Sequence, residues 1–137
     1  MGQKEMKITA DTNVLIRVVV EDEPHQAWLA AKILREAELV AVPTTVLCEF
    51  VWVLRRGYKK SASEVLSAIH KLMLSPNVAM NRPAIEAGLF VLAAGGDFAD
   101  GVIAHEGDRL GGEEFVSFDS KAVSILQSQR TRARLLQ

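Results

Sequence analysis

Four acidic residues stand along the chain where carboxylates could share one chemical task. Asp11 follows a short alternating segment, Glu49 lies within an apolar helical pattern, Asp100 follows a glycine pair and Asp119 follows an apolar run. Carboxylates brought to one place repel each other, and a divalent cation relieves that repulsion. A donor set made only of oxygen favours Mg²⁺ or Mn²⁺ over zinc or copper. The acids therefore indicate metal-dependent chemistry, provided that the fold gathers them.

A purely structural explanation is available for two of these acids, Asp11 and Asp119, and for a neighbouring aspartate, Asp97. Asp11 and Asp119 precede expected helices, where an aspartate caps the helix by accepting hydrogen bonds from its first N–H groups. Asp97 stands three residues before Asp100 at the start of another helix, in a pattern similar to a capping box. We expect Asp97 to act as a cap in preference to a ligand, and Asp100 to lie on the first helical turn.

Glu49 is harder to explain as a structural residue. At about 100° per residue it falls at the border of the apolar stripe of its helix, flanked by Trp52 and Val53. A carboxylate among large apolar groups is costly unless it is paired, hydrogen-bonded or bound to a metal. An ion pair with Arg55 or Arg56 is the structural alternative, and the sequence leaves both explanations open.

Strands and helices alternate along the chain, and their order would position these acids. Strands are expected at Met6–Ala10, Leu39–Val42, Asn77–Met80, Phe115–Phe118 and Ala133–Leu136. Helices are expected at Val14–Val20, at Pro24–Ala37, from a cap at Thr44 or Thr45 to Arg56, from Ser61 or Ser63 through Met73, at Pro83–Ala94, at Asp97–Leu110 and at Asp119–Gln127. Two glycine pairs, Gly95–Gly96 and Gly111–Gly112, break the chain between elements.

This alternation predicts a three-layer α/β/α sandwich with a four- or five-stranded parallel sheet. In such folds ligands bind outside the C-terminal ends of the strands. Asp11 and Asp119 each follow a strand, so we expect both carboxylates at that edge of the sheet. The chain is expected to form a single domain over residues 1–137, in which residues 1–5 are either part of the domain or an extension ahead of a native start at Met6.

The bulk composition limits the class of protein. The chain has 137 residues, 49% hydrophobic and 24% charged, which is the balance of a globular domain. Sixteen basic and 17 acidic residues give a formal charge of −1, which argues against a surface built wholly to bind nucleic acid but permits a local basic patch. A single cysteine, Cys48, excludes an intrachain disulfide framework. The apolar runs are too short for a signal peptide or a membrane span, so we expect a soluble, cytoplasmic protein.

The acids stand in motifs that resemble those of PIN-domain ribonucleases. The matching segments are Ile8–Leu15 (ITADTNVL), Thr45–Glu49 (TVLCE), Asp97–Asp100 (DFAD) and Ser117–Asp119 (SFD). The resemblance runs over essentially the whole chain and is closest to the VapC-type toxins of bacterial toxin–antitoxin pairs. A lone D-T-N motif is weak, whereas the ordered set over a chain of this size is strong.

The resemblance implies roles for individual residues. It implies that four acids, Asp11, Glu49, Asp100 and Asp119, bind the metal and carry out catalysis. It leaves a second-metal or supporting role open for Asp97, and it places Asn13 and Ser117 beside the acids, with serine where threonine is commoner. The family implies an endoribonuclease that depends on Mg²⁺ or Mn²⁺, cleaves RNA, often forms a homodimer and is inhibited by a cognate antitoxin.

Other small α/β domains also carry acids at strand ends. A receiver-type phosphoacceptor should have paired acids after the first strand and a lysine after a late strand, but this chain has Asp11-Thr12-Asn13 and no such lysine. A phosphatase similar to the haloacid dehalogenases needs an aspartate where Asn13 stands. A PIN-like domain used only to bind RNA or protein would be expected to have lost an acid, and all four are present. The pattern favours the ribonuclease.

Overall fold

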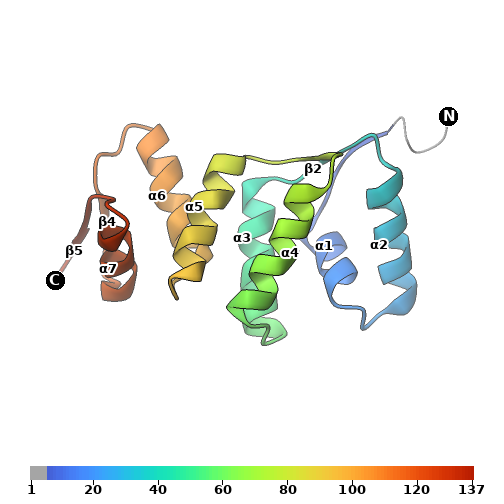
Figure 1. Ribbon diagram of the computed structural model, residues 1–137, viewed down its shortest axis with the longest axis horizontal. Helices are drawn as coiled ribbons and strands as arrows, with labels where there is room; N and C mark the ends of the chain where they lie inside the picture. Colours follow the sequence, from blue (N-terminus) through green and yellow to red (C-terminus); the bar gives the residue numbers. More distant parts are fainter. Residues whose placement is uncertain (1–5) are drawn as a thin grey trace. The chain divides into compact units, whose positions relative to one another are not determined.

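Strands and helices alternate as the sequence predicts over residues 6–137, which a computed structural model describes (Figure 1). The extension considered for residues 1–5 lies outside the described residues. Contacts within the chain define two compact units, unit 1 (Met1–Asn81) and unit 2 (Arg82–Gln137). Within residues 6–137, no helix is both long and apolar enough to span a membrane.

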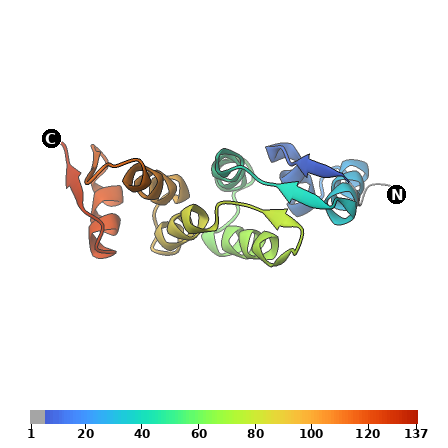
Figure 2. The ribbon, with the colours of Figure 1, turned by 90° about the horizontal axis from the view of Figure 1, so that it is seen from above.

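Unit 1 contains a parallel three-stranded sheet and the helices that connect its strands. Its elements are β1 (Lys7–Thr9), α1 (Thr12–Val19), α2 (Pro24–Glu36), β2 (Leu39–Ala41), α3 (Thr44–Trp52), η2 (Val53–Gly57), α4 (Ala62–Leu74) and β3 (Val78–Ala79). The strand order is β1-β2-β3, with Ile8 opposite Val40 and Val40 opposite Val78 (Figure 2). Because β1 and β2 run parallel, their C-terminal ends lie at the same edge of this sheet.

The core of unit 1 lies between this sheet and its helices. Val40 is fully buried, and it lines the same cavity as Leu15 of α1 and Phe50 of α3. On β1, by contrast, Lys7 and Thr9 are exposed on either side of the half-buried Ile8. This alternation is typical of a strand with only one covered face.

In unit 1, the predicted start of α4 is confirmed and the predicted cap of α3 is not. Ser61 caps α4 in a capping box, because its hydroxyl accepts from the N–H of Glu64 and the carboxylate of Glu64 accepts from the N–H of Ser61. The cap expected at Thr44 or Thr45 is wrong. The N-cap of α3 is Pro43, and it makes no side-chain cap bond. The single helix expected to reach Arg56 is instead α-helical to Trp52 and π-helical over Val53–Gly57.

Unit 2 combines a helical pair with a small parallel sheet. Its elements are α5 (Arg82–Ala93), α6 (Phe98–Arg109), β4 (Phe115–Ser117), α7 (Ser120–Ser128) and β5 (Ala133–Leu135). Strand β4 pairs with β5 through the α7 crossover, with Phe115 opposite Ala133. The predicted breaks are confirmed at Gly95 and Gly111, whose φ angles of 95° and 109° are in the left-handed region that favours glycine.

Helices α5 and α6 pack unusually closely at two glycines. A Cβ at Gly88 would lie 2.7 Å from the Phe98 ring, and a Cβ at Gly101 would overlap the backbone of Ala87. Phe98 itself is fully buried. The absence of two side chains therefore allows the backbones of the two helices to approach each other.

The α/β class with parallel strands is confirmed, and all five predicted strands form. Three of these strands pair in parallel in unit 1 and two pair in parallel in unit 2, and this arrangement is compatible with the predicted three-layer α/β/α sandwich.

Candidate functional site

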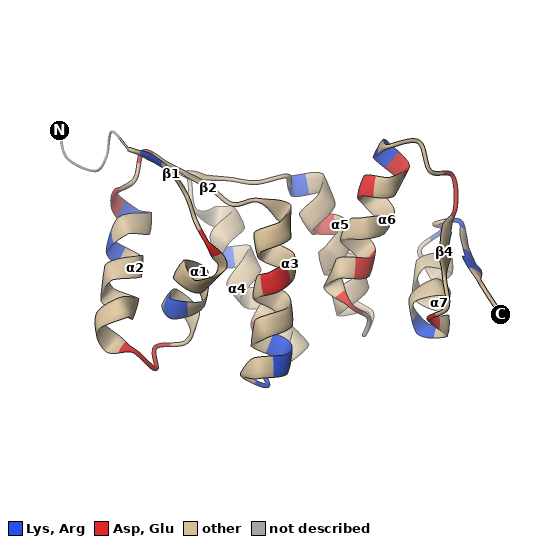
Figure 3. Ribbon diagram, turned by 180° about the vertical axis from the view of Figure 1, so that it is seen from behind, with Lys and Arg blue, Asp and Glu red and all other residues tan. Residues whose placement is uncertain are grey.

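Asp11 and Glu49 are held by the same residue at the C-terminal edge of the unit 1 sheet. Asp11 follows β1 and is the N-cap of α1, where its Oδ1 accepts a hydrogen bond of 2.8 Å from the backbone N–H of Thr12. The hydroxyl of Thr12 in turn donates to Oε1 of Glu49 at 2.5 Å. Glu49 belongs to α3, and this helix begins shortly after the C-terminal end of β2. Figure 3 shows α3 next to the strands of unit 1. The structure thus brings two of the four predicted acids together.

The surroundings of Glu49 differ from those expected. The sequence placed this carboxylate among large apolar groups, but in the structure Glu49 is exposed. Within the described chain its hydrogen-bond partner is Thr12 and not Arg55 or Arg56. Arg55 instead donates to the backbone carbonyl of Lys60 at 3.1 Å. The ion pair that the sequence left open is therefore not the interaction that fixes this carboxylate.

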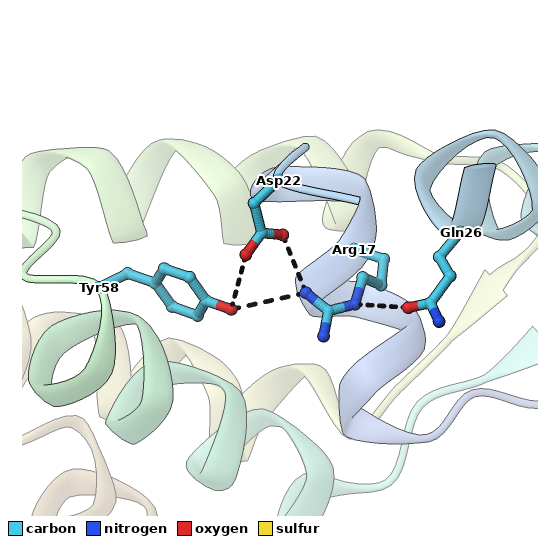
Figure 4. Close-up of polar contacts among 4 residues, drawn as sticks. All are labelled: Arg17, Asp22, Gln26 and Tyr58. Atoms are coloured by element: carbon cyan, nitrogen blue, oxygen red, sulfur yellow. Dashed lines mark hydrogen bonds and ion pairs between the residues drawn. The ribbon is translucent and has the colours of Figure 1, made fainter. Parts of the chain in front are cut away.

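The far ends of the two helical segments that carry Asp11 and Glu49 are also linked. Arg17 on α1 donates to Asp22 and to Gln26, both at 2.9 Å (Figure 4). The same guanidinium donates to the hydroxyl of Tyr58, directly after η2, at 3.5 Å, and that hydroxyl donates to Asp22 at 3.4 Å. The hydrogen bond with Tyr58 and then the charge of Asp22 raise the pKa of Arg17, so this group stays cationic.

The acids of unit 2 are fixed mainly as helix caps. Asp97 is the N-cap of α6 and accepts from the N–H of Ala99 at 3.2 Å. Asp119 follows β4 as the N-cap of α7, and its Oδ1 accepts from two backbone N–H groups, those of Lys121 at 3.0 Å and Ala122 at 3.1 Å. The structural explanation of both aspartates is thus confirmed. It does not exclude a ligand role, because these bonds use one oxygen of each carboxylate.

Ser117 and Asn13, the two predicted supporting residues, have different surroundings. The hydroxyl of Ser117 accepts a hydrogen bond from the N–H of Asp119 at 2.9 Å, so it helps to fix the backbone of that acid. Asn13 is exposed on the first turn of α1, where it lines a shallow hollow of about 430 Å³ between α1 and α2 together with Arg17 and Lys32.

Asp100 is the acid whose electrostatic environment is most unfavourable to its charge. It lies half-buried on the first turn of α6. Burial raises the pKa of Asp100, and the carboxylates of Asp97 and Asp119 raise it further. In unit 2, therefore, the charges of Asp97 and Asp119 both act on the carboxyl group of Asp100.

The donor set is compatible with a hard divalent cation. Neither unit by itself, over residues 6–137, groups three histidine, cysteine or acidic side chains closely enough to hold a metal ion. Each unit does present carboxylates, and those of unit 2 act on one another by charge. Oxygen donors of this kind are those that Mg²⁺ and Mn²⁺ accept, whereas zinc sites draw mainly on histidine and cysteine.

Comparison with known families decides the class of the protein. The family model of the PIN domain matches residues 8–125, which include all four predicted acids. The chain belongs to the PIN domain family. PIN domains are generally nucleases, and they typically use divalent metals. No curated protein matches this PIN domain.

Thr12, which links Asp11 to Glu49 in this PIN domain, was not among the residues predicted from the sequence. It is 5% exposed, and within residues 6–137 no other polar or charged side chain is buried. A signal was present, because on a helix Thr12 shares a face with Leu15 and Ile16, three and four residues later, and both of these are buried. A hydroxyl on the buried face of a helix, next to a predicted catalytic acid, needs a partner.

Proposed function

We propose that this PIN domain is an endoribonuclease dependent on Mg²⁺ or Mn²⁺, and that it is the toxin of a toxin–antitoxin pair. The observation that supports it most directly is the PIN-domain match over residues 8–125, which includes all four acids. In addition, burial of Asp100 raises its pKa, and the charges of Asp97 and Asp119 raise it further. Such an arrangement is unfavourable for an empty site and favourable for one that binds a cation.

The proposal gives each acid a role. The proposed ligands are the four acids that the family motifs imply, Asp11, Glu49, Asp100 and Asp119, with Asp97 as a further ligand or as a second-metal residue. When bound, the cation lowers the pKa of a water molecule and neutralises charge on the phosphate. The chain's own contribution is to hold the carboxylates in place, through Thr12 for Asp11 and Glu49 and through Ser117 and the start of α7 for Asp119.

RNA is the proposed substrate, and a basic segment of unit 1 is suited to its phosphates. Figure 3 shows basic residues at the far end of the segment that begins with α3. They belong to the sequence that follows Glu49 along the chain, namely Arg55, Arg56, Lys59 and Lys60, of which the first three are exposed. Such side chains add affinity without base specificity, because they contact the phosphate backbone.

The toxin role, the homodimer, the cytoplasmic location and a cognate antitoxin follow from the resemblance to VapC-type toxins. An antitoxin arginine or lysine placed among the carboxylates would compete electrostatically with the cation. Expression of the wild-type chain alone should then slow growth, whereas expression of Asp100→Asn should not. Normal growth at high levels of an enzyme that cleaves RNA in vitro would refute the toxin role and leave the nuclease intact.

Cleavage assays on matched variants test the enzymatic proposal. RNA should be cut in Mg²⁺ or Mn²⁺ but not in EDTA, and Asp11→Asn in unit 1 and Asp100→Asn in unit 2 should each abolish cutting while circular dichroism shows a folded protein. Glu23→Gln and Glu86→Gln, one exposed acid from each unit, serve as controls and should cut normally. Activity in EDTA would refute the mechanism. Loss of activity in only one of the two aspartate variants would refute the four-acid assignment.

A further inference from the structure

A single side chain between two acids of the proposed site fixes how they are presented. We infer that Thr12 is a positioning residue, which sets the carboxylate of Glu49 against that of Asp11 for metal binding. This inference rests on the proposed function, since it assigns a task to Thr12 within that site. It starts from two hydrogen bonds, one from the backbone N–H of Thr12 to Asp11 at 2.8 Å and one from its hydroxyl to Glu49 at 2.5 Å.

The burial of Thr12 makes this hydroxyl an effective anchor. The residue is 5% exposed and shares the buried face of α1 with Leu15 and Ile16, each 2% exposed. Water therefore has little access to its side chain, and a β-branched residue in a helix has few rotamers. The hydroxyl is fixed in place and its proton is directed at Glu49.

Glu49, by contrast, depends on its partner for a defined position. It is exposed on α3, and a free glutamate side chain samples many rotamers. Thr12 occupies Oε1, so the carboxylate is held at one oxygen while the other remains for a ligand. Partners of this kind that orient a metal ligand typically change metal affinity about 10–100-fold when they are removed.

The two hydrogen bonds of Thr12 can be separated experimentally. Its backbone N–H donates to the N-cap Asp11 whatever the side chain at position 12, so a side-chain substitution removes only the bond to Glu49. Thr12→Val keeps the β-branched shape and loses the hydroxyl. Thr12→Ser keeps the hydroxyl and loses a methyl group. Thr45→Val, on an exposed residue of the α3 first turn, is the matched control.

Mn²⁺ binding by the full chain, measured by isothermal titration calorimetry, tests the inference. Thr12→Val should weaken Mn²⁺ binding about 10–100-fold, while Thr12→Ser and Thr45→Val should bind within a few-fold of the wild type. Equal binding by the wild type and Thr12→Val would overturn the role of Thr12 and leave the proposed nuclease standing. A wild type that binds no Mn²⁺ would overturn the proposed metal site, and this inference with it.

A double-mutant cycle with Glu49→Gln distinguishes positioning from a general effect on folding. If Thr12 acts through the Glu49 carboxylate, Thr12→Val should weaken Mn²⁺ binding much less in the Glu49→Gln protein than in the wild type. An undiminished effect in that background would mean that Thr12 supports the fold alone, and would overturn the inference. If Thr12→Val does not fold, Thr12→Ala in the same cycle gives the same two outcomes.

Discussion

The hydroxyl of Ser117 accepts a hydrogen bond of 2.9 Å from the backbone N–H of Asp119. This bond joins the last residue of β4 to the N-cap of α7, and the carboxylate of Asp119 is further fixed by the N–H groups of Lys121 and Ala122. These two bonds hold one oxygen of the Asp119 carboxylate at the start of α7. Burial raises the pKa of Asp100, and the negative charges of Asp97 and Asp119 raise that pKa further.

Asp100→Asn should stabilise the metal-free protein at neutral pH. Because the pKa of Asp100 is raised by burial, Asp97 and Asp119, the folded chain binds a proton there more tightly than the unfolded chain. The ionised carboxylate therefore destabilises the fold above its raised pKa, and the penalty disappears below the ordinary aspartate pKa of about 3.9. The gain in Tm should be largest near neutral pH and vanish as the pH falls through this window.

Thermal melts in EDTA across this pH range, followed by circular dichroism, check the prediction. Glu86→Gln is the control, since Glu86 is exposed on α5, and its effect on Tm should be small at every pH. An Asp100→Asn protein no more stable than the wild type at neutral pH would contradict the electrostatic account of the unit 2 acids.

A divalent cation should reverse the order of stability of these two proteins. A ligand that binds only the folded state at 100 times its Kd stabilises that state by about 2.7 kcal/mol. Wild-type Tm should rise with Mn²⁺ or Mg²⁺, whereas Asp100→Asn, which has lost a ligand, should gain much less. The melts are repeated with increasing Mn²⁺ and again after adding EDTA. Equal shifts in both proteins would mean that Asp100 does not bind the cation.

Gly101→Ala should destabilise unit 2, because the new Cβ would overlap the backbone of Ala87 and lie 2.8 Å from the Cα of Gly88. Backbone atoms cannot rotate away as a side chain can, so α5 and α6 must separate, at a cost of about 1–3 kcal/mol. Gly107→Ala on the same helix is the control, since nothing lies within 4 Å of its Cβ, and it should be neutral or stabilising. Urea denaturation measures both free energies of unfolding, and similar values would contradict the close packing.

The sequence predicted the elements well because local signals governed most of their ends. Asp97 and Asp119 cap the helices that they were expected to cap, and Ser61, one of the two serines considered for the start of α4, is its N-cap. Pro43 was misjudged, because neighbouring threonines are the better capping residues on local preference alone. The π-helical turn at Val53–Gly57 gives no simple pattern in sequence, since it depends on how the chain after α3 is held.

The site was predicted in its residue types and only partly in its contacts. Asp11 and Glu49 were placed from motif order, and the structure does bring them to one sheet edge. Their link through Thr12 could not be derived, because it joins side chains from two separate helices, and such pairing depends on tertiary packing. The same limit explains why Arg55 and Arg56, adjacent along the chain, looked like better partners for Glu49 than Thr12 did.

The proposed mechanism predicts the chemistry of the cut RNA ends. Water attacking in line with the departing 3′-oxygen forms a bond from its own oxygen to phosphorus and breaks the P–O3′ bond. One fragment then carries a 5′-phosphate and the other a 3′-hydroxyl. Nucleases that use two histidines instead let the ribose 2′-hydroxyl attack, which gives a 2′,3′-cyclic phosphate. In this chain His25, His70 and His105 lie on three different helices, α2, α4 and α6, whereas carboxylates occupy the strand ends.

Mass spectrometry of a labelled oligonucleotide cleaved in Mg²⁺ should therefore show a 5′-phosphate and a 3′-hydroxyl from the earliest time points. A substrate with 2′-deoxyribose at the scissile position should still be cut, although recognition can weaken because a 2′-hydroxyl contact is lost. Asp11→Asn, which removes a proposed ligand, should give neither product. If a cyclic phosphate is the first product, or if the 2′-deoxy substrate resists cleavage while it binds normally, the attacking group is the ribose hydroxyl. The carboxylates of Asp11, Glu49, Asp100 and Asp119 would then need a different task.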